Sequence, residues 1–200
     1  MRESSDRMAD RFFVAGMEIL AENGFGGLKL ATVCRRVGVT SGSFYHHFDS
    51  WQDFTRQLVE RWREQHTVRL VELARAEEDP AERVELLLRY GVLLPHAAEA
   101  AIRAWSSIDP VVAAVQKSVD DERLDISTEA LEALMDDPDE ASDVALTALY
   151  LLVGFQQTTG GRNERDFERF LRLLQDRALT YAGAEDLMSD AHGAHSGLRP

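Results

Sequence analysis

The stretch from Leu28 to Phe48, LKLATVCRRVGVTSGSFYHHF, constrains the fold more than any other part of the sequence. Its apolar residues recur at helical spacing over residues 30–37 and predict a short helix with one buried face. Gly38 then ends that helix, because glycine adopts the left-handed backbone at little cost. Thr40 or Ser41 can cap the helix that follows. The stretch therefore predicts two short helices joined by a tight turn.

The second helix of this pair is expected to run to Phe48 and to expose small and hydrogen-bonding residues around one apolar anchor, Phe44. Small residues allow the backbone to approach a groove floor, and hydroxyl and imidazole groups can contact phosphates or base edges. The candidate DNA-contacting residues here are Thr40, Ser41, Gly42, Ser43, Tyr45, His46 and His47. An ordinary helical hairpin with a polar outer face fits the spacing alone equally well.

The run from Val33 to Phe48 resembles the DNA-binding end of the tetracycline-repressor (TetR) family of transcriptional regulators. That pattern has an apolar residue and Ala, two variable residues, Ala-Gly-Val-Ser, and later an aromatic or aliphatic residue, Tyr, any residue, His or Tyr, and Phe. The resemblance covers about the first fifty residues and favours DNA binding over the plain hairpin. It implies a helix-turn-helix domain followed by a helical domain that dimerises.

Three positions depart from the family pattern. Cys34 stands where Ala is usual. Lys29 stands where the family tends to have a Thr that touches a phosphate, and it joins the candidate DNA contacts. The Lys that commonly follows the final Phe is absent, because Asp49-Ser50-Trp51 occupy that place. Lys29 is expected to replace part of the missing phosphate contact.

The formal net charge of −13 is unevenly distributed along the chain. Residues 1–70 hold ten Lys or Arg and nine Asp or Glu, whereas residues 71–200 hold twelve and twenty-six. The acidic part is expected to face away from DNA and to weaken non-specific adhesion to nucleic acid. The DNA face relies on few cations, chiefly Lys29, Arg35 and Arg36, so we expect modest non-specific affinity and a shallow salt dependence.

Several classes of protein are disfavoured by the sequence. It has no apolar run long enough for a bilayer, and its N-terminus lacks a secretory hydrophobic region. The single cysteine, Cys34, excludes an internal disulfide and a multi-cysteine metal site. No nucleophile–base or metal-ligand spacing supports an enzyme. We therefore expect a cytoplasmic protein without catalytic activity, cofactor or metal ion.

Helical periodicity, without sustained strand-like alternation, predicts an all-α fold for the 200 residues. The expected helices outside the central stretch cover residues 6–23, 51 to the low 70s, 81–94, 96–107, 110–135, an apolar segment from 144 to 155, and 163–182. Residues 1–50 are expected to form the three-helix helix-turn-helix domain, and 51–182 a helical effector-binding and dimerisation domain. Residues 183–200 are small and polar, which predicts a disordered tail.

The segment from Val144 to Phe155 is almost entirely apolar. Such a helix must be covered on two sides, by its own core and by a second molecule. The resemblance also implies a two-fold homodimer, formed by this helix and the last one. The residues expected at the interface are Val144, Leu149, Leu152, Phe167, Phe170 and Leu174.

Aromatic and polar-tipped residues interrupt otherwise apolar helices, a mixture that ligand sites use. The candidates are Tyr90, His96, Trp105, Phe155 and Gln156, although core or interface filling explains each one better when it is taken alone. We hypothesise that a small molecule binds among residues 81–157 and tilts the helix of residues 51–75. The two recognition helices, which must lie about 34 Å apart on a duplex, would then leave their register.

This mechanism is that of a repressor released from its double-stranded DNA operator by an effector. The alternative is a helical dimeric interaction or ligand-binding module without DNA binding, which the missing Lys near Trp51 makes credible.

Overall fold

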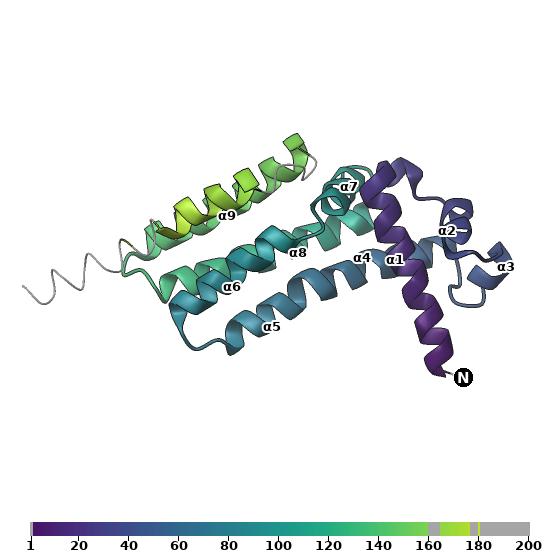
Figure 1. The fold of residues 1–200 in the computed structure, drawn as a ribbon, viewed down its shortest axis with the longest axis horizontal. Coiled ribbons are helices and arrows are strands. Elements are labelled where there is room, and N and C mark those ends of the chain that lie inside the picture. Colours follow the sequence, from purple (N-terminus) through teal and green to yellow (C-terminus); the bar gives the residue numbers. More distant parts are fainter. Residues whose placement is uncertain (1, 160–164, 177–179, 181–200) are drawn as a thin grey trace, which may run out of the picture. The chain divides into compact units, whose positions relative to one another are not determined.

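The computed structural model describes residues 2–159, 165–176 and 180, and all regular structure in these residues is helical (Figure 1). This confirms the predicted all-α fold. The described chain divides into two compact units. The first unit comprises 2–69, 94–121 and 155–159, and the second comprises 70–93, 122–154 and 165–176. None of the described helices is both long and apolar enough to cross a membrane.

The first helix, α1 (Arg2–Gly27), supplies the scaffold for the helix-turn-helix. Gly24 interrupts its helical geometry with φ 65° and ψ −175°, so the regular helix ends where Asn23-Gly24 predicts an end. The helix begins at Arg2, earlier than predicted. Its inner side is strongly buried, with Phe12, Ile19 and Leu20 fully covered.

The predicted helical pair is present, with one difference in length. Helix α2 (Leu30–Val37) has the predicted bounds, and Gly38 closes it in the left-handed conformation with φ 80°. Helix α3 (Ser41–Phe44) is shorter than predicted, because residues 45–47 form a turn instead of continuing to Phe48. There the amide of His46 donates to the carbonyl of Ser43, a contact of three residues in place of four.

The long helix after the helix-turn-helix is continuous but not regular. Helix α4 (Trp51–Arg63) passes through a π-helical turn, η1 (Glu64–Val68), into α5 (Arg69–Ala76). Its start is well capped, because Ser50 Oγ accepts from the Asp53 amide at 2.9 Å. The extent of this helix confirms the prediction, whereas the π turn was not predicted.

Three of the remaining helices begin with the same Asp-Pro device. These are α6 (Pro80–Leu93), α8 (Pro110–Glu132) and α9 (Pro138–Thr159). The carboxylates of Asp79, Asp109 and Asp137 accept from backbone amides of the first turn at 2.8–3.0 Å. Proline suits the first helical position because its missing N–H would have no partner there. Helix α7 (His96–Ser106) follows Pro95.

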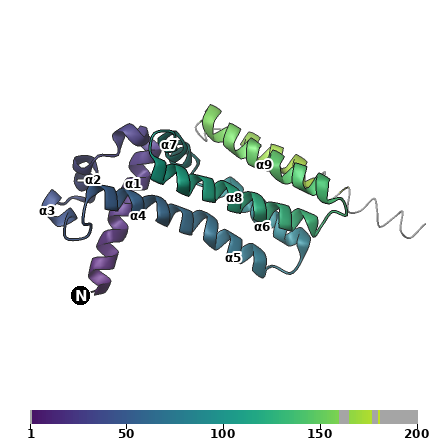
Figure 2. The same ribbon diagram turned by 180° about the vertical axis from the view of Figure 1, so that it is seen from behind.

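Each unit has its own core. In the first unit α1 packs against α2, α4 and α7 (Figures 1 and 2). In the second unit the core is built from small and aliphatic side chains of α6, α8, α9 and the turn between α8 and α9, namely Val84, Ala130, Leu131, Met135, Ala141, Val144 and Ala145. The helical stretch 165–176 lies alongside α9 in both ribbon views and joins α6 through Gln175 Nε2, which donates to Glu85 at 2.8 Å.

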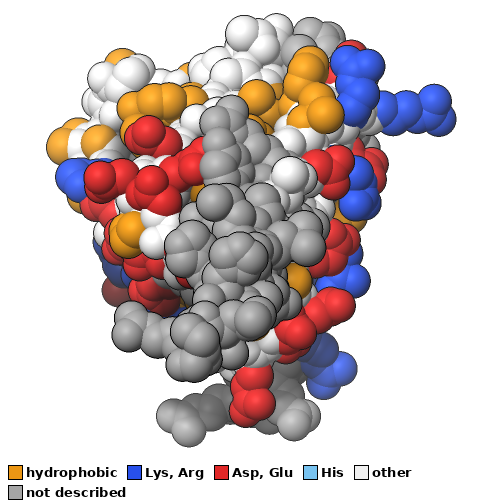
Figure 3. Space-filling view, turned by 90° about the vertical axis from the view of Figure 1, so that its left-hand side faces the viewer, with side chains coloured by type: hydrophobic (Ala, Val, Ile, Leu, Met, Phe, Trp, Pro, Cys, Tyr) orange, Lys and Arg blue, Asp and Glu red, His pale blue; other side chains and the backbone are white. Residues whose placement is uncertain are grey.

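Acidic side chains outnumber basic ones on the face shown in Figure 3. The sequence predicts a break at residues 158–161, but α9 continues through Thr159, and the rest of that break lies outside the described residues. The predicted tail of residues 183–200 lies outside them as well.

Candidate functional site

Phe44 fixes the recognition segment, residues 40–47, to the scaffold. Its ring is completely buried and lies 5.4 Å from the ring of Phe12, 4.9 Å from Phe48 and 5.4 Å from Phe54. The pairs with Phe12 and Phe54 are edge-to-face, and such ring pairs contribute to stability beyond the area that they bury. The aromatic core formed by Phe12, Phe13, Phe44, Phe48 and Phe54 therefore gives a short helix a firm base.

Most of the candidate DNA contacts in the recognition segment are exposed. Thr40, Ser41, Gly42, Tyr45 and His46 face solvent, and the side chain of Tyr45 is 53% exposed. Thr40 Oγ1 also accepts from the Ser43 amide at 3.4 Å, so Thr40 is the cap of α3.

Two members of the predicted set are less accessible. Ser43 is half-buried, and so is His47, whose ring lies 5.8 Å from that of Phe12. The structure thus presents one exposed set in the recognition segment, Thr40 to Gly42 with Tyr45 and His46, rather than eight equal candidates. Lys29 is exposed at the start of α2, where its side chain makes no cap hydrogen bond.

Gly42 leaves open space on this surface. A Cβ atom built at Gly42 would meet only Thr40 Oγ1, at 3.7 Å, which is ordinary van der Waals contact. The fold itself therefore does not require glycine at this position. A close approach of another molecule to the α3 backbone would supply a reason for it.

One of the three cations expected to contact DNA, Arg36, is already engaged in ion pairs within the protein. Arg36 donates to Glu18 at 3.1 Å and to Glu22 at 3.0 and 2.5 Å, which ties α2 to α1. This hydrogen bonding lowers the pKa of Glu22 and raises that of Arg36. The expectation that Arg36 serves the DNA face is not supported, because two carboxylates already hold it. Lys29, Arg35 and Arg36 are all exposed, but Arg36 is held by the carboxylates of α1.

Cys34, the departure from the usual Ala, is buried in the core of the first unit. Burial raises the pKa of its thiol. A buried cysteine behaves as a small apolar side chain, so this departure conserves the packing of α2.

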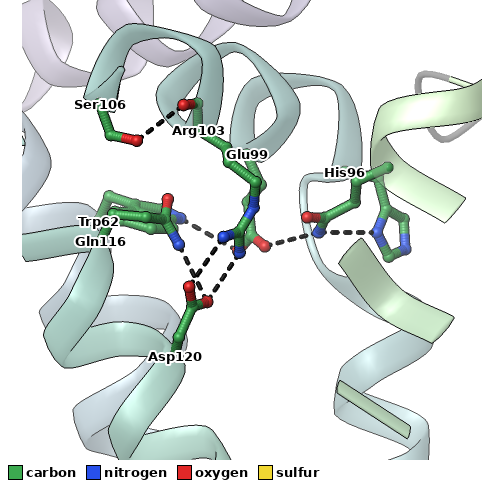
Figure 4. A network of polar contacts seen from close by, with 8 residues as sticks. Trp62, His96, Glu99, Arg103, Ser106, Gln116 and Asp120 are labelled. Atoms are coloured by element: carbon green, nitrogen blue, oxygen red, sulfur yellow. Dashed lines mark hydrogen bonds and ion pairs between the residues drawn. The ribbon is translucent and has the colours of Figure 1, made fainter. Parts of the chain in front are cut away.

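A buried polar cluster lies on α7 in the first unit (Figure 4). We call it the Glu99 cluster, and it consists of Trp62, His96, Glu99 and Gln156. Trp62 Nε1 donates to Glu99 Oε1 at 3.1 Å, and Gln156 Nε2 donates to Glu99 Oε2 at 2.8 Å. Gln156 Nε2 lies 3.5 Å from His96 Nδ1, and the ring of Phe155 meets the His96 ring edge-on at 4.9 Å.

Three of the five predicted ligand residues, His96, Phe155 and Gln156, therefore come together. Trp105 lies elsewhere, stacked on Phe25 with ring centroids 4.7 Å apart, and it is core filling. Tyr90 lies in α6 in the second unit and is half-buried.

Glu99 was missed by the sequence reasoning. It is 2% exposed, and it lies three residues after His96 and three before Ile102, both of which are buried. This spacing places a carboxylate on the buried face of an alanine-rich helix, and that signal could have identified it.

A second polar group lies on the same helix (Figure 4). The guanidinium of Arg103 donates to both carboxylate oxygens of Asp120, at 2.8 and 2.7 Å. Gln116 Nε2 donates to Asp120 Oδ1 at 3.1 Å. This carboxylate therefore has a bidentate cationic partner, an arrangement that is stronger than a neutral hydrogen bond.

The predicted interface residues divide into three groups by exposure. Val144, Leu152 and Phe167 are buried within the second unit, and Leu149 and Leu174 are half-buried. Phe170 is 44% exposed. Two exposed apolar residues that the sequence reasoning did not select, Tyr150 and Leu173, lie on the same two helices.

Within the described residues, no three His, Cys, Asp or Glu side chains are grouped so that they could hold a metal ion.

Residues 13–58 match the family model of the bacterial regulatory proteins of the tetR family. No curated protein matches the chain in sequence. The match covers α3 together with the helices that support it, which is the region where the exposed set lies.

Solved structures share the fold over most of the chain. A TetR-family transcriptional regulator from Agrobacterium tumefaciens is 18% identical, with a TM-score of 0.72 over 86% of this chain and 98% of its own. A putative transcriptional regulator from Saccharomonospora viridis in complex with choline is 16% identical, with a TM-score of 0.68 over 84% and 94%. The transcriptional regulator FadR from Bacillus subtilis in complex with stearoyl-CoA is 14% identical, with a TM-score of 0.61 over 85% and 97%.

Proposed function

We propose that this chain, a transcriptional regulator that belongs to the tetR family of bacterial regulatory proteins, binds a DNA operator as a homodimer and is released by a small-molecule effector. The observation that carries the proposal is the exposed set on α3, held by a buried Phe44 and located within the matched segment. The proposal includes a cytoplasmic location, where operator DNA is found, and no catalytic reaction.

In this proposal the recognition segment enters the major groove. Tyr45 and His46 contact base edges or phosphates, and the bare backbone at Gly42 allows close approach. Lys29 supplies the phosphate contact nearest to the segment. Ser43 and His47 contribute less, because both are half-buried.

The homodimer is proposed from the exposed face of α9 and residues 165–176. Tyr150, Phe170 and Leu173 are 66%, 44% and 57% exposed, which is unusual for large apolar side chains on neighbouring helices. Arg169 and Glu168 flank them, so one face carries both signs of charge. A two-fold axis pairs such a face with its own copy, since each charge can meet the opposite one.

The effector is proposed to bind at the Glu99 cluster. Three predicted ligand residues meet there, and the cluster links α4 to α7 and to the end of α9 by hydrogen bonds. Helix α4 directly follows the recognition segment, so a ligand that changes these hydrogen bonds acts on the helix nearest to the DNA contacts. Two structural neighbours were solved with small molecules, choline and stearoyl-CoA, which supports a ligand-responsive regulator.

The test begins with DNA sequences selected by the full chain from a random duplex pool, followed by fluorescence anisotropy titration of the selected duplex. Tyr45→Ala and His46→Ala are each expected to weaken binding by about 1–3 kcal/mol, the range for a lost base contact. Leu73→Ala is the matched control, because Leu73 is an exposed residue of α5 in the second unit. Selection of no sequence at low salt would instead favour the alternative, a helical module without DNA binding.

The dimer is tested separately by sedimentation. Phe170→Glu with Leu173→Glu is expected to give a monomer, because each change places a charge on the proposed apolar face. If the double variant still sediments as a dimer, the interface does not lie on this face.

A further inference from the structure

The recognition segment depends on its two ends for its direction. Helix α3 has only four residues, too few to hold a direction by its own hydrogen bonds. Phe44 anchors its C-terminal end from beneath, because that ring is completely buried. Its N-terminal end follows directly from the turn of residues 38–40, which begins where α2 ends. The contacts that hold this turn therefore set where the recognition segment begins.

Arg11 on α1 makes a hydrogen bond to the end of α2, next to this turn. Its Nη2 donates to the carbonyl oxygen of Val37 at 2.8 Å, across 26 residues of sequence. Val37 is the last residue of α2, and the last carbonyls of a helix have no partner within it. A guanidinium suits this place, because it is a charged donor and the C-terminal end of a helix is the negative end of its dipole.

Within the part of the chain that the structure describes, this is the one hydrogen bond that reaches residues 37–41 from outside the helical pair. The other hydrogen bonds of these residues stay within residues 33–45. Arg11 has no carboxylate partner among the described residues, and its second contact is with Met8 Sδ at 3.7 Å, a weak acceptor. The guanidinium of Arg11 thus serves the turn rather than an ion pair.

We infer that Arg11 is a positioning residue for operator recognition. Its hydrogen bond to the Val37 carbonyl holds the turn, and together with Phe44 it fixes the direction of α3. Without this donor the recognition segment keeps Phe44 as its anchor but can turn about it, so its exposed side chains lose their common alignment with the base edges. Arg11 acts through the turn and does not contact DNA. This inference rests on the proposed function, since it names a residue that supports DNA reading.

The experiment compares three variants of the full chain with the wild type by fluorescence anisotropy. Each is titrated with the selected operator duplex and with a duplex of unrelated sequence. Arg11→Met keeps the apolar stem and removes the donor, whereas Arg11→Lys keeps a cationic donor. Arg61→Met is the matched control, because Arg61 also binds α1, through Asp10 at 2.8 Å, and its loss changes the net charge equally.

Arg11→Met is expected to lower the affinity for the operator about tenfold, the effect of one charge-assisted hydrogen bond. Its affinity for the unrelated duplex should not change, because phosphate contacts carry no sequence information. Arg11→Lys should lose less, and Arg61→Met should bind as the wild type does. The inference is overturned if Arg11→Met keeps the wild-type affinity for the operator, or if either other variant loses as much as Arg11→Met.

The salt dependence of binding separates this role from a direct phosphate contact. A phosphate contact by Arg11 would mean that Arg11→Met weakens binding to both duplexes and reduces the slope of log affinity against log salt by about 0.9. We expect an unchanged slope, and a slope reduced by this amount would overturn the inference.

Amide hydrogen exchange of the free protein tests the same role without DNA. Arg11→Met should raise exchange at residues 38–47 and leave α7 as protected as in the wild type, whereas Arg61→Met should leave residues 38–47 unchanged. Unchanged exchange at residues 38–47 in Arg11→Met, or a rise in all helices alike, would overturn the inference. If the wild type selects no operator, the proposed function fails, while faster exchange at residues 38–47 still assigns control of the turn to Arg11.

Discussion

The aromatic core beneath α3 and the Glu99 cluster lie in the same compact unit but are built from opposite materials. The aromatic core joins α1, α3 and α4 through phenylalanine rings, which have no hydrogen-bonding groups to satisfy. Its close packing tolerates little change in the shape of a side chain. The Glu99 cluster joins α4, α7 and α9 through directional hydrogen bonds and leaves the oxygen of Gln156 without a partner in the described residues.

This difference shows how one unit can hold the recognition segment rigidly while the hydrogen bonds of the Glu99 cluster can change. Ring packing holds the recognition segment in one geometry, whereas a polar cluster with an unused acceptor can change its hydrogen bonds when a suitable donor arrives. A shift of this kind requires that the ligand bind one arrangement better than the other. Four predictions, in order of decreasing effect, can break or sharpen the comparison.

The largest effect is expected from Phe44→Ala. Phe44 is fully buried and contacts the rings of Phe12, Phe48 and Phe54, so its truncation leaves a cavity. The free energy of unfolding should fall by about 3–5 kcal/mol, as measured by urea denaturation. Phe44→Leu should lower the free energy of unfolding by less than Phe44→Ala does. If Phe44→Ala lost under about 1 kcal/mol, the aromatic core would not be the rigid element that the comparison requires.

A smaller but non-additive effect is expected at Glu99. Glu99→Ala removes the acceptor of Trp62 Nε1 and Gln156 Nε2 and should cost about 1–3 kcal/mol for each buried donor affected. Gln156→Leu should cost less in the Glu99→Ala background than alone, because the donor and its acceptor are then removed together. Thermal unfolding of the two single variants and the double variant gives this coupling. Strict additivity would show that the cluster does not act as a unit.

Gly16→Ala should have a modest effect on the aromatic core. A Cβ atom at Gly16 would lie 3.0 Å from Leu58 Cδ2 and 3.3 Å from Phe54 Cζ, and both side chains are fully buried. We expect a net loss of about 1 kcal/mol, since overpacking outweighs the gain in helix propensity.

Gly42→Ala is the matched control for this change, because that position is open. It should leave the thermal midpoint equal or higher while weakening DNA binding. An unchanged DNA affinity would show that the α3 backbone does not approach the duplex closely.

The smallest effect concerns pH. Hydrogen bonds from Arg36 lower the pKa of Glu22 from its ordinary value of 4.5. Stabilisation from a depressed carboxyl pKa is present above the unfolded-state value and is lost as the pH falls through the folded-state value. The thermal midpoint of the wild-type protein should therefore decrease more steeply than that of Glu22→Gln below about pH 5. Glu60→Gln, at another exposed acid of the same unit, serves as the control, and parallel pH curves for wild type and Glu22→Gln would contradict the expectation.

Much of the fold was predictable because its helix boundaries are encoded locally. Gly38 ends α2 at the predicted residue, and the Asp-Pro pairs start three helices through contacts within one turn. The π turn at Glu64–Val68 was not predictable, because no residue pattern in the long helix marks a one-residue change of hydrogen bonding. The exposed character of Tyr45 and His46 followed from the position of Phe44.

The candidate site was predictable only where it is local. The recognition segment lies within eight consecutive residues, whereas Glu99 meets Gln156 from 57 residues away. Arg36 shows the same limit, since its carboxylate partners on α1 precede it by 14 and 18 residues and change it from a free cation into a tie between helices. Pairings of this kind depend on how helices pack, which the period of a single helix does not reveal.

Because Cys34 is buried, its reactivity with a thiol reagent can report local opening of the core that surrounds it. The sequence contains a single thiol, and it lies in the core that supports α2 and α3, where a thiol reagent cannot reach it until that core loosens. The rate of alkylation at Cys34 therefore reports how often the DNA-reading end breathes, without any added label. The same measurement on the operator complex would show how far a bound duplex suppresses that breathing.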